Sequence, residues 1–562
     1  MKTESISEQR FEKLASILIA SVAIWVAITA YFQNYAANIS DQARRRAQQY
    51  SIEATKKEVT GTIQYSYEWQ GAYQTWKELE WQIIAADQNG DTAAVERFSQ
   101  IQERILPMSR MLAPEYFDPA VGFPDTSKYE AESYLVESTR LAEIYLAESA
   151  LGNATDNTAD ALIVQITLLT VSLSLFGLSM ALKGPVRWLF IIVGSGIVGI
   201  CMVWLSWSLL ELFIRPEVNE TAITYYAEGV GLEYQGYHQE AIQKFDLAIT
   251  ENQFYAKAYY QRGLAYYELG DYAKAITEIE KARYEGLDDT NLNWNLAWIY
   301  YLSGDYAKAI ETNNRVLNEH PEVLGMRMNQ AITYLSMGDL NNARAQYDLL
   351  VQEAEKQVAE ARRNNLEPPA SLWYYMDAGA LDLQNLIDSI DNNPKTWTQA
   401  PTSNLIQGDH SQIRSFALEQ MKRMKEITVA LEYSGQLPVA QETMQVEPFI
   451  FGLITGEDAE GNITNFEPAA NAVIPYGEKE VTVQFTYSGP PPSQMLWKVY
   501  VNGYEDAAFR IFTNDDISGG STWYKTFGFG YTNIFILSPG EYTVELYADN
   551  ILVQSGTFFV QE

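Results

Sequence analysis

The sequence is poor in the residues that build metal centres and disulfide frameworks. Its 562 residues include 1 cysteine and 3 histidines. One cysteine excludes a disulfide framework and a cysteine-based zinc site, and histidines far apart along the chain give no basis for a histidine-rich metal centre. We therefore expect no cofactor and no metal ligands.

Basic residues are scarce as well. The chain has 39 lysines and arginines against 72 acidic residues, a formal net charge of −33. A protein that binds the backbone of nucleic acids needs a basic face to neutralise phosphates, so no nucleic-acid partner is expected. The apolar share of 47% excludes disorder as a global description, and the length suits about three or four domains.

Motifs of enzymatic catalysis are missing from the sequence. There is no HExxH, no P-loop, no paired CxxC and no GxSxG, and His238, His320 and His410 are widely separated. Residues 194–199 do read GxGxxG, but the residues that follow are apolar all round, unlike the helix of a dinucleotide site. Small residues that let membrane helices approach closely explain this motif better. No catalytic residues are predicted, and the chain is not expected to be an enzyme.

Three long uncharged apolar runs mark candidate membrane helices. They cover 19 residues from Leu14 to Phe32, 22 from Ala161 to Leu182, and 23 from Trp188 to Leu210. A helix needs about 20 such residues to cross a bilayer. The sequence predicts transmembrane helices over 14–32, 161–182 and 188–214, after a tail over 1–13. A cleaved signal peptide is the alternative for the first run, and buried soluble helices for the other two.

Charges next to these runs indicate the orientation. Lys2, Arg10 and Lys13 precede the first run, and the short loop 183–187 between the other two holds two basic residues. Positive residues favour the cytoplasmic side. Residues 33–160 and everything after 215 would then be extracytoplasmic, which describes an integral membrane protein with most of its chain outside. Residues 44–46, three consecutive arginines, conflict with this orientation.

The region 33–160 is predicted to be a helical stalk or bundle. No proline occurs from Gln33 to Asp87, so the first membrane helix is expected to continue into a stalk. Further helices are predicted over about 92–106 and 129–151. Tryptophans and tyrosines between residues 65 and 81 would form the bundle core or, alternatively, a partner surface.

A 34-residue period begins after Pro216. In each period an alanine follows a glycine by five residues, a spacing that suits a turn between two closely packed helices. The pattern resembles the tetratricopeptide repeat (TPR) family, and four repeats are predicted over 222–355. The glycines are Gly236, Gly270, Gly304 and Gly338, and the alanines are Ala241, Ala275, Ala309 and Ala343.

The resemblance implies a helical solenoid whose first helices line a concave groove for a peptide. By position, the groove here is aromatic and mostly uncharged, and it lacks the basic clamp of members that bind a C-terminal carboxylate. An apolar or aromatic partner segment is therefore expected. The alternative is that the chain fills its own groove; residues 356–440, read as degenerate repeats or a cap, are the candidate. The predicted groove residues are Tyr226, Tyr260, Leu264, Tyr267, Trp294, Trp298, Tyr301 and Met328.

Residues 446–562 change to a period of two, which indicates β-strands. Frequent turn signals suit a β-sandwich, and 537–560 resembles the last hairpin of an immunoglobulin-like domain of a bacterial surface protein. Trp523 and Tyr524 are candidates for a glycan-stacking platform, with packing inside the domain as the alternative. The acidic residues that would hold calcium, or else lie in solvated turns, are Asp458, Glu460, Asp515 and Asp516.

The fold class is thus a multidomain α + β chain with three transmembrane helices, a helical extracytoplasmic bundle, a TPR solenoid and a β-sandwich. The predicted function is a membrane-anchored extracytoplasmic scaffold that holds protein partners in a bacterial cell-envelope complex. Two alternatives remain, a glycan- or envelope-binding anchor and a transmembrane sensor that acts through a membrane partner. A homo-oligomer is compatible with each of them.

Overall fold

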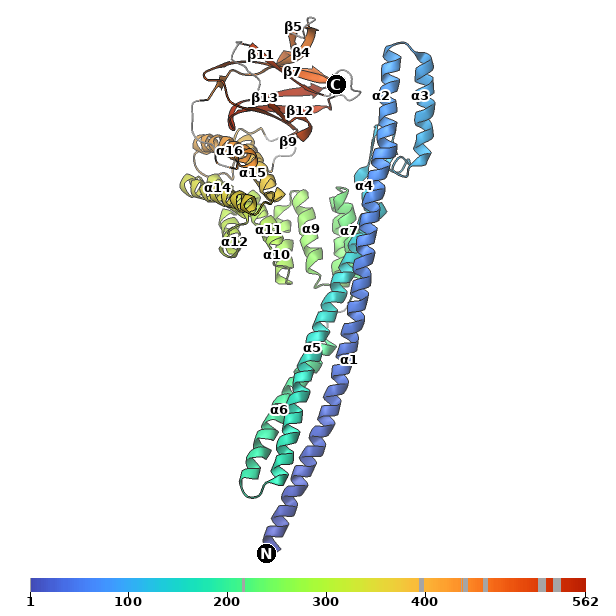
Figure 1. The fold of residues 1–562 in the computed structure, drawn as a ribbon, viewed down its shortest axis with the longest axis vertical. Coiled ribbons are helices and arrows are strands. Elements are labelled where there is room, and N and C mark those ends of the chain that lie inside the picture. The colour runs from blue at the N-terminus through green and yellow to red at the C-terminus, as the bar shows by residue number, and fades with distance from the viewer. Residues whose placement is uncertain are drawn as a thin grey trace. The chain divides into compact units, whose positions relative to one another are not determined.

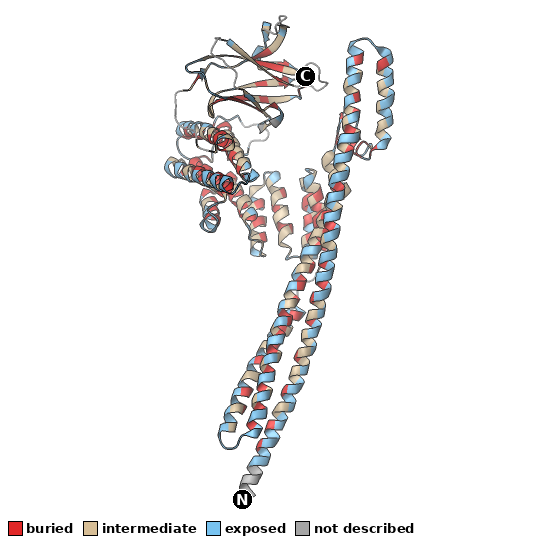
Figure 2. Cartoon of the chain, in the orientation of Figure 1, coloured by how far each residue is buried: buried red, intermediate tan, exposed pale blue. Residues whose placement is uncertain are grey.

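The computed structural model divides into two compact units. One comprises Met1–Tyr73 and Pro107–Ala265, and the other comprises Gln74–Leu106 and Tyr266–Glu562. Figure 1 labels the elements and Figure 2 shows the burial of each residue. The structure describes residues 2–214, 218–393, 399–435, 437, 443–457, 463–513, 522–528 and 537–561.

Three long helices dominate the first unit. Helix α1 (Lys2–Glu68) is unbroken over 67 residues and ends in a π-helical turn, Trp69–Tyr73. Helix α5 (Val136–Ala181) packs antiparallel to α1, and α6 (Val186–Phe213) returns along α5 (Figure 1). By length and composition, three helical segments of the described chain are apolar enough to cross a membrane: Glu8–Gln88, Thr126–Ala181 and Val186–Phe213.

Small buried residues recur along the inner side of α1 (Figure 2). They are spaced by seven residues over the apolar run and beyond it, with one step of four between Ala43 and Ala47. A seven-residue repeat keeps one stripe of a helix against its partner, and small side chains let the two backbones approach closely. The stripe consists of Ala15, Val22, Thr29, Ala36, Ala43, Ala47, Ala54 and Gly61.

The expected helix over 129–151 was wrong at its C-terminal end. A short helix α4 (Thr126–Glu130) and a π-helical turn (Ala131–Leu135) lead into α5, which runs through Gly152 into the second apolar run without a break. Packing on α1 explains this continuity: Ser40 Oγ donates to the Gly152 carbonyl at 2.9 Å. A side chain at 152 would meet Arg44 Cγ at 3.2 Å.

Gly194 fits the membrane-helix interpretation of the GxGxxG motif. A Cβ atom at this position would lie 2.6 Å from the Phe176 ring of α5. Gly196 and Gly199 have no such neighbour within 4 Å. The motif lies inside α6, and the element directly before it is helix α5 and not a strand, so it lacks the context of a dinucleotide site.

The first repeat belongs to the same unit as the long helices. Helices α7 (Glu220–Tyr234) and α8 (His238–Glu251) pack against the beginning of α9 (Ala256–Glu268). Gly229 permits this packing, because its Cβ would lie 2.5 Å from the Phe245 ring. Helix α7 also packs against α5 and the turn that precedes it.

The second unit continues the helical repeats. Gly270, Gly304 and Gly338 adopt left-handed φ angles of 75°, 81° and 78°, a conformation that glycine adopts readily. The aspartate after each glycine caps the next helix with its side chain. The helices are α10 (Tyr272–Tyr284), α11 (Thr290–Ser303), α12 (Tyr306–Glu319), α13 (Leu324–Ser336) and α14 (Leu340–Arg363).

A fifth helix pair follows the repeats. Helix α15 (Ala370–Ile390) packs on α13, and α16 (His410–Tyr433) packs on α14 and α15. This arrangement continues the stacking of the repeats, but the loop between the two helices is much longer than the glycine–aspartate turns. The same unit contains a separate helical hairpin, α2 (Gln74–Gln88) with α3 (Thr92–Ile105).

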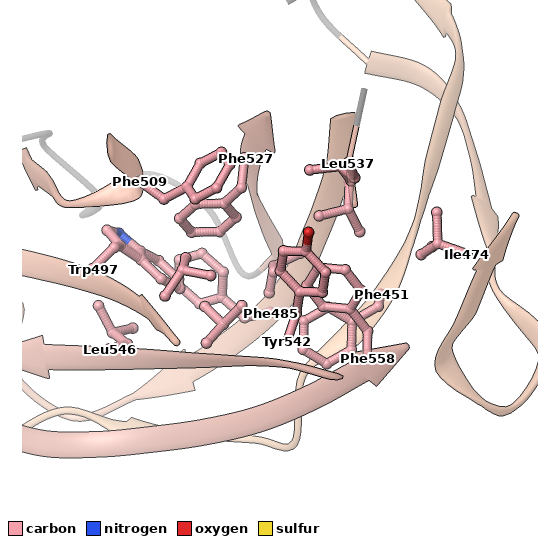
Figure 3. Packing of buried hydrophobic residues seen from close by; sticks show 14 of the residues in the cluster. Phe451, Ile474, Phe485, Trp497, Phe509, Phe527, Leu537, Tyr542, Leu546 and Phe558 are labelled. Atoms are coloured by element: carbon pink, nitrogen blue, oxygen red, sulfur yellow. The ribbon is translucent and has the colours of Figure 1, made fainter. Parts of the chain in front are cut away.

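The C-terminal region forms two antiparallel-rich sheets that share one core (Figure 3). Trp497 contacts Phe485 and Phe527 across the sheets, and Tyr542 stacks on Phe558. The strand order of the first sheet is β10 (Ile511–Thr513), β8 (Met495–Val501), β12 (Gly540–Ala548), β13 (Ile551–Gln561) and β6 (Val473–Pro475), and β9 (Tyr504–Glu505) also pairs with β8. The strand order of the second sheet is β11 (Thr522–Gly528), β7 (Glu480–Ser488), β4 (Ile450–Glu457) and β5 (Ile463–Pro468), and β3 (Gln445–Val446) also pairs with β7.

Helix α16 covers the outer face of β8 and β12. Val429 packs with Leu496 and Tyr547, whose side chains point away from the core between the sheets. Beside this contact, the fully buried Glu545 pairs with Lys425 of α16 and accepts a hydrogen bond from Tyr547 OH at 2.7 Å. The last helix of the solenoid and the sandwich are therefore joined by apolar packing and a buried ion pair.

Candidate functional site

The first helices of the repeats present a shared surface with α15 in the second unit. Tyr375, Gly379 and Asp382 recur at i, i+4 and i+7, so they lie on one face of α15. This face meets α13 and α11: Gly379 packs on Met328, and Tyr375 packs on Trp294 with ring centroids 5.0 Å apart. We call this surface the inner surface; it consists of Trp294, Trp298, Tyr301, Gly325, Met328, Tyr375, Gly379 and Asp382.

Aromatic rings form the side of the inner surface that α11 contributes. The rings of Trp298 and Tyr301 lie 4.8 Å apart. Tyr301 is fully buried and accepts a hydrogen bond from Ser336 Oγ at 3.4 Å, whereas Trp298 remains partly exposed. Trp298 also hydrogen-bonds the side chain of Tyr267, which fixes the indole between two tyrosines.

The inner surface also contains a carboxyl group, that of Asp382, close to these rings. Burial raises the pKa of its carboxyl group to about 7, and the carboxylate charge helps to raise the pKa values of Tyr267 and Tyr301. Part of the side chain still reaches solvent. Within the described residues no lysine or arginine pairs with Asp382. The site therefore combines a carboxylate with partly exposed rings and lacks a cation.

The loop between α15 and α16 crosses the ends of the repeat helices. Tyr267 OH donates to Gln399 Oε1 at 2.8 Å, and Tyr306 OH donates to the Leu405 carbonyl at 3.1 Å. The Gln407 amide donates to the Ser336 carbonyl at 2.7 Å. The described residues 399–408 thus form a strap that binds three successive repeats at their glycine turns.

The first two repeats have a different neighbour, the stalk helix α5. Glu143 of α5 accepts hydrogen bonds from Lys257 Nζ at 2.6 Å and from Tyr255 OH at 3.0 Å. Gly231 of α7 lies against Val136, where a Cβ would be 2.3 Å from a methyl group. The chain itself therefore supplies both the acid and the base of this contact.

The predicted groove residues differ in their accessibility. Tyr226, Tyr301 and Met328 are buried, and the first of them packs against Phe245 and Tyr255. The other five are partly exposed: Tyr260, Leu264, Tyr267, Trp294 and Trp298. Of these, Trp294 and Tyr267 already contact α15 and the strap, so Trp298 is the partly exposed residue at the centre of the inner surface.

The two candidates for a glycan platform lie on opposite sides of β11. Trp523 pairs with Phe485 and packs on the core between the sheets. Tyr524 points the other way, accepts a hydrogen bond from Gln484 Nε2 at 2.8 Å and contacts Phe466. Successive side chains of a strand face opposite sides, so these rings form no common surface. The calcium candidates at 458, 460, 515 and 516 lie outside the described residues.

The two side chains that α15 contributes to the inner surface besides Gly379, those of Tyr375 and Asp382, were not among the predicted groove residues. They lie after the repeats lose their 34-residue register, so positions could not be carried over to them. The spacing of Tyr375, Gly379 and Asp382 indicates that they share one face of a helix. It does not indicate which helices pack against that face. A search of the described residues found no group of three or more metal-ligating side chains.

Comparison with known proteins supports the repeats. Residues 226–291 and 260–323 match the family model of the tetratricopeptide repeat. The chain therefore carries TPR repeats, as the spacing of its glycines and alanines predicted. No match was found among curated proteins.

Several solved structures are similar to parts of the chain. One is YrrB, described as a TPR protein with an unusual peptide-binding site, at 15% identity over 38% of this chain and 91% of that chain, with a TM-score of 0.24. Another is the Rap conjugation gene regulator of plasmid pLS20 in complex with a Phr peptide, at 14% identity over 64% and 97%, with a TM-score of 0.23. A third is an immunoglobulin-like protein from Pseudomonas aeruginosa, at 16% identity over 22% and 100%, with a TM-score of 0.16.

Proposed function

We propose that this protein is a membrane-anchored scaffold that holds protein partners outside the cytoplasm through its TPR repeats. The observation that carries the proposal is the joining of two features in one unit. Helices with apolar, membrane-length segments continue into a stalk, and α5 of that stalk packs directly on the first repeat. A solenoid attached in this way would be held close to the membrane surface.

The contacts of the stalk arginines support the proposed orientation. The Arg46 guanidinium forms a bidentate salt bridge with the Glu148 carboxylate, in which Nε donates to Oε1 at 2.7 Å and Nη2 donates to Oε2 at 3.0 Å. Arg44 pairs with Asp156. The positive-inside preference concerns basic residues near the ends of membrane helices. Arginines neutralised by carboxylates of α5 are a weaker obstacle to an extracytoplasmic stalk than free arginines would be.

Labelling of a single introduced cysteine tests this topology. Gln445→Cys, at an exposed site on β3, is combined with Cys201→Ser to remove the only native thiol. Labelling by a membrane-impermeant maleimide on intact cells is expected. If the cysteine reacts only after the cells are opened, the extracytoplasmic scaffold is wrong and the repeats face cytoplasmic partners.

A sensor is a second candidate, because α1 passes from its apolar run to Glu68 as one helix. Phe11 of α1 and Arg187 at the start of α6 are in contact, with the guanidinium 4.0 Å from the ring centroid. Disulfide formation between Phe11→Cys and Arg187→Cys, without Cys201, would report movement of α1. A several-fold change in its rate on partner binding would favour the sensor, and a constant rate would favour the scaffold.

The glycan-binding alternative has less support, since Trp523 and Tyr524 face opposite sides of their strand. Catalysis forms no part of the proposal. The expected partner is a protein segment that reaches the first helices of the repeats. Homo-oligomerisation is compatible with the stalk but is not required by it.

A further inference from the structure

The inner surface has the composition of a receptor for a positive charge. Its carboxylate, Asp382, lies on the face of α15 that packs on α11 and α13, one turn beyond Gly379. The charge of Asp382 helps to raise the pKa values of three tyrosines, and two of these, Tyr267 and Tyr301, contact Trp298. The carboxylate and the indole therefore belong to one cluster.

The same cluster lacks the cation that would balance this acid. Two other carboxylates of the unit have basic partners: Glu545 pairs with Lys425, and Glu505 pairs with Lys498 at 3.0 Å. An acid that stays without a partner in a partly desolvated place costs free energy, which a cationic ligand would recover. A neutral apolar ligand would leave that cost in place.

The rings define how a cation would be held. The Trp298 indole packs at a tilt against the Tyr301 ring, and Trp298 remains partly exposed. Indole faces attract lysine and arginine side chains through the ring quadrupole, and a nearby carboxylate adds a charge-assisted hydrogen bond. The strap at 399–408 and the Trp294–Tyr375 contact occupy neighbouring parts of the surface.

We propose that the inner surface binds a lysine or arginine side chain of an extended partner segment, with Asp382 as the counter-charge and Trp298 as the ring that receives the cation. This inference rests on the proposed scaffold function and specifies the chemistry of its partner. The segment would carry an isolated basic residue between apolar ones, since the surrounding surface is aromatic.

The test measures binding of a peptide labelled with fluorescein at its N-terminal amine, fluorescein-Gly-Leu-Lys-Leu-Gly-amide, to the full chain in detergent by fluorescence anisotropy. A peptide with glutamine in place of lysine is the ligand control. Asp382→Asn keeps the side-chain shape and removes the charge, and it is expected to weaken binding at least about tenfold. Trp298→Leu is expected to weaken it about fivefold.

The control variant is Glu311→Gln, which removes one negative charge from an exposed position of α12. It separates a specific site from general attraction to a chain of net charge −33. We expect less than a twofold change for this variant, and a thermal midpoint for Asp382→Asn no lower than that of the unaltered chain. Equal losses for Asp382→Asn and Glu311→Gln would overturn the inference.

Failure of the inference can be told apart from failure of the scaffold function. If the lysine and glutamine peptides bind equally, or neither binds, the cation site is wrong. The cysteine-labelling result does not depend on that outcome. Cytoplasmic labelling at position 445 would remove the extracytoplasmic scaffold but would leave peptide binding by the purified chain unaffected.

Discussion

Two carboxylates, Glu143 in one unit and Asp382 in the other, both come from helices outside the four repeats, and both face first helices of the repeats. Glu143 of α5 is satisfied by Lys257 and Tyr255 from within the chain. Asp382 of α15 faces tyrosines and has no basic partner among the described residues. The difference indicates that the first two repeats attach to the stalk, whereas the surface of the third and fourth repeats carries an acid without a basic partner among the described residues.

A third carboxylate, Glu545 of the sandwich, extends this comparison. It is fully buried, pairs with Lys425 and accepts a hydrogen bond from Tyr547. Glu143 and Glu545, which join elements of the chain, thus both have a lysine partner within it. Removing the charge from each of the three should change the free energy of unfolding by different amounts, and for Asp382 with the opposite sign.

The largest effect is expected for Glu545→Gln. The change leaves Lys425 without its counter-charge in a mostly buried place, which costs about 3–5 kcal/mol. Urea unfolding followed by circular dichroism measures this loss. A loss below about 1 kcal/mol would show that water replaces the pair and that the helix–sandwich contact is only apolar.

A smaller loss is expected for Glu143→Gln, because Lys257 is about one-third exposed, with 36% of its side-chain surface accessible. Weakening this pair should cost about 1–2 kcal/mol and loosen the contact of α9, the first helix of the second repeat, with the stalk. Hydrogen exchange over 256–268 should become faster, while exchange over 324–336 stays unchanged. Equal acceleration in both segments would contradict a local role for Glu143.

Asp382→Asn is expected to stabilise the chain by about 1–2 kcal/mol at pH 8 in the absence of ligand. The pKa of Asp382 is about 7 in the folded state, above its ordinary value of 3.8. The folded state therefore holds this proton more tightly than the unfolded state, and the free energy of unfolding falls as pH rises from about 4 to about 7. In the Asp382→Asn variant, the free energy of unfolding should decrease less steeply over this pH range.

Asp377 is the control for this pH prediction, since burial raises its pKa to about 6. The decrease in the free energy of unfolding that Asp377 causes ends about one pH unit lower than that of Asp382. This decrease is still present in the Asp382→Asn variant. Thermal unfolding at several pH values between 4 and 8 separates the two. If Asp382→Asn leaves the whole pH profile unchanged, the carboxylate has a partner or full solvation, and the comparison fails.

The smallest effect concerns the turn of the first repeat. Asp271, Asp305 and Asp339 cap the helices that follow the later glycines, but Tyr237 makes no side-chain cap for α8. Tyr237→Asp should supply the missing acceptor and stabilise the chain by about 0.5–1 kcal/mol. Tyr237→Ala is the matched control, and an equal gain from it would exclude a capping effect.

Sequence reasoning reached the regular parts of the chain. The 34-residue period predicted the TPR helices, and the glycines of the later periods lie at the turns between them. These features are local, since they follow from turn residues and helical periodicity. The alternation of β11 also implies that Trp523 and Tyr524 face opposite sides, a consequence that the platform hypothesis overlooked.

The remaining features depend on contacts between distant residues. Helix α5 continues through Gly152 because that glycine packs on α1, although glycine alone favours a break. The strap and the position of Asp382 likewise follow from how α15 stacks on α13. Residues 356–440 were the candidate to fill the groove, but no pattern within them identifies which face of α15 meets Trp294 and Met328.

Site-specific photo-crosslinking tests the central claim most directly. A benzoylphenylalanine is placed at Trp298 of the inner surface or at Val230 of the first repeat, in cells that naturally make the protein. The account predicts an adduct with a separate protein from position 298 and none from position 230. An adduct from position 230, with none from position 298, would contradict it.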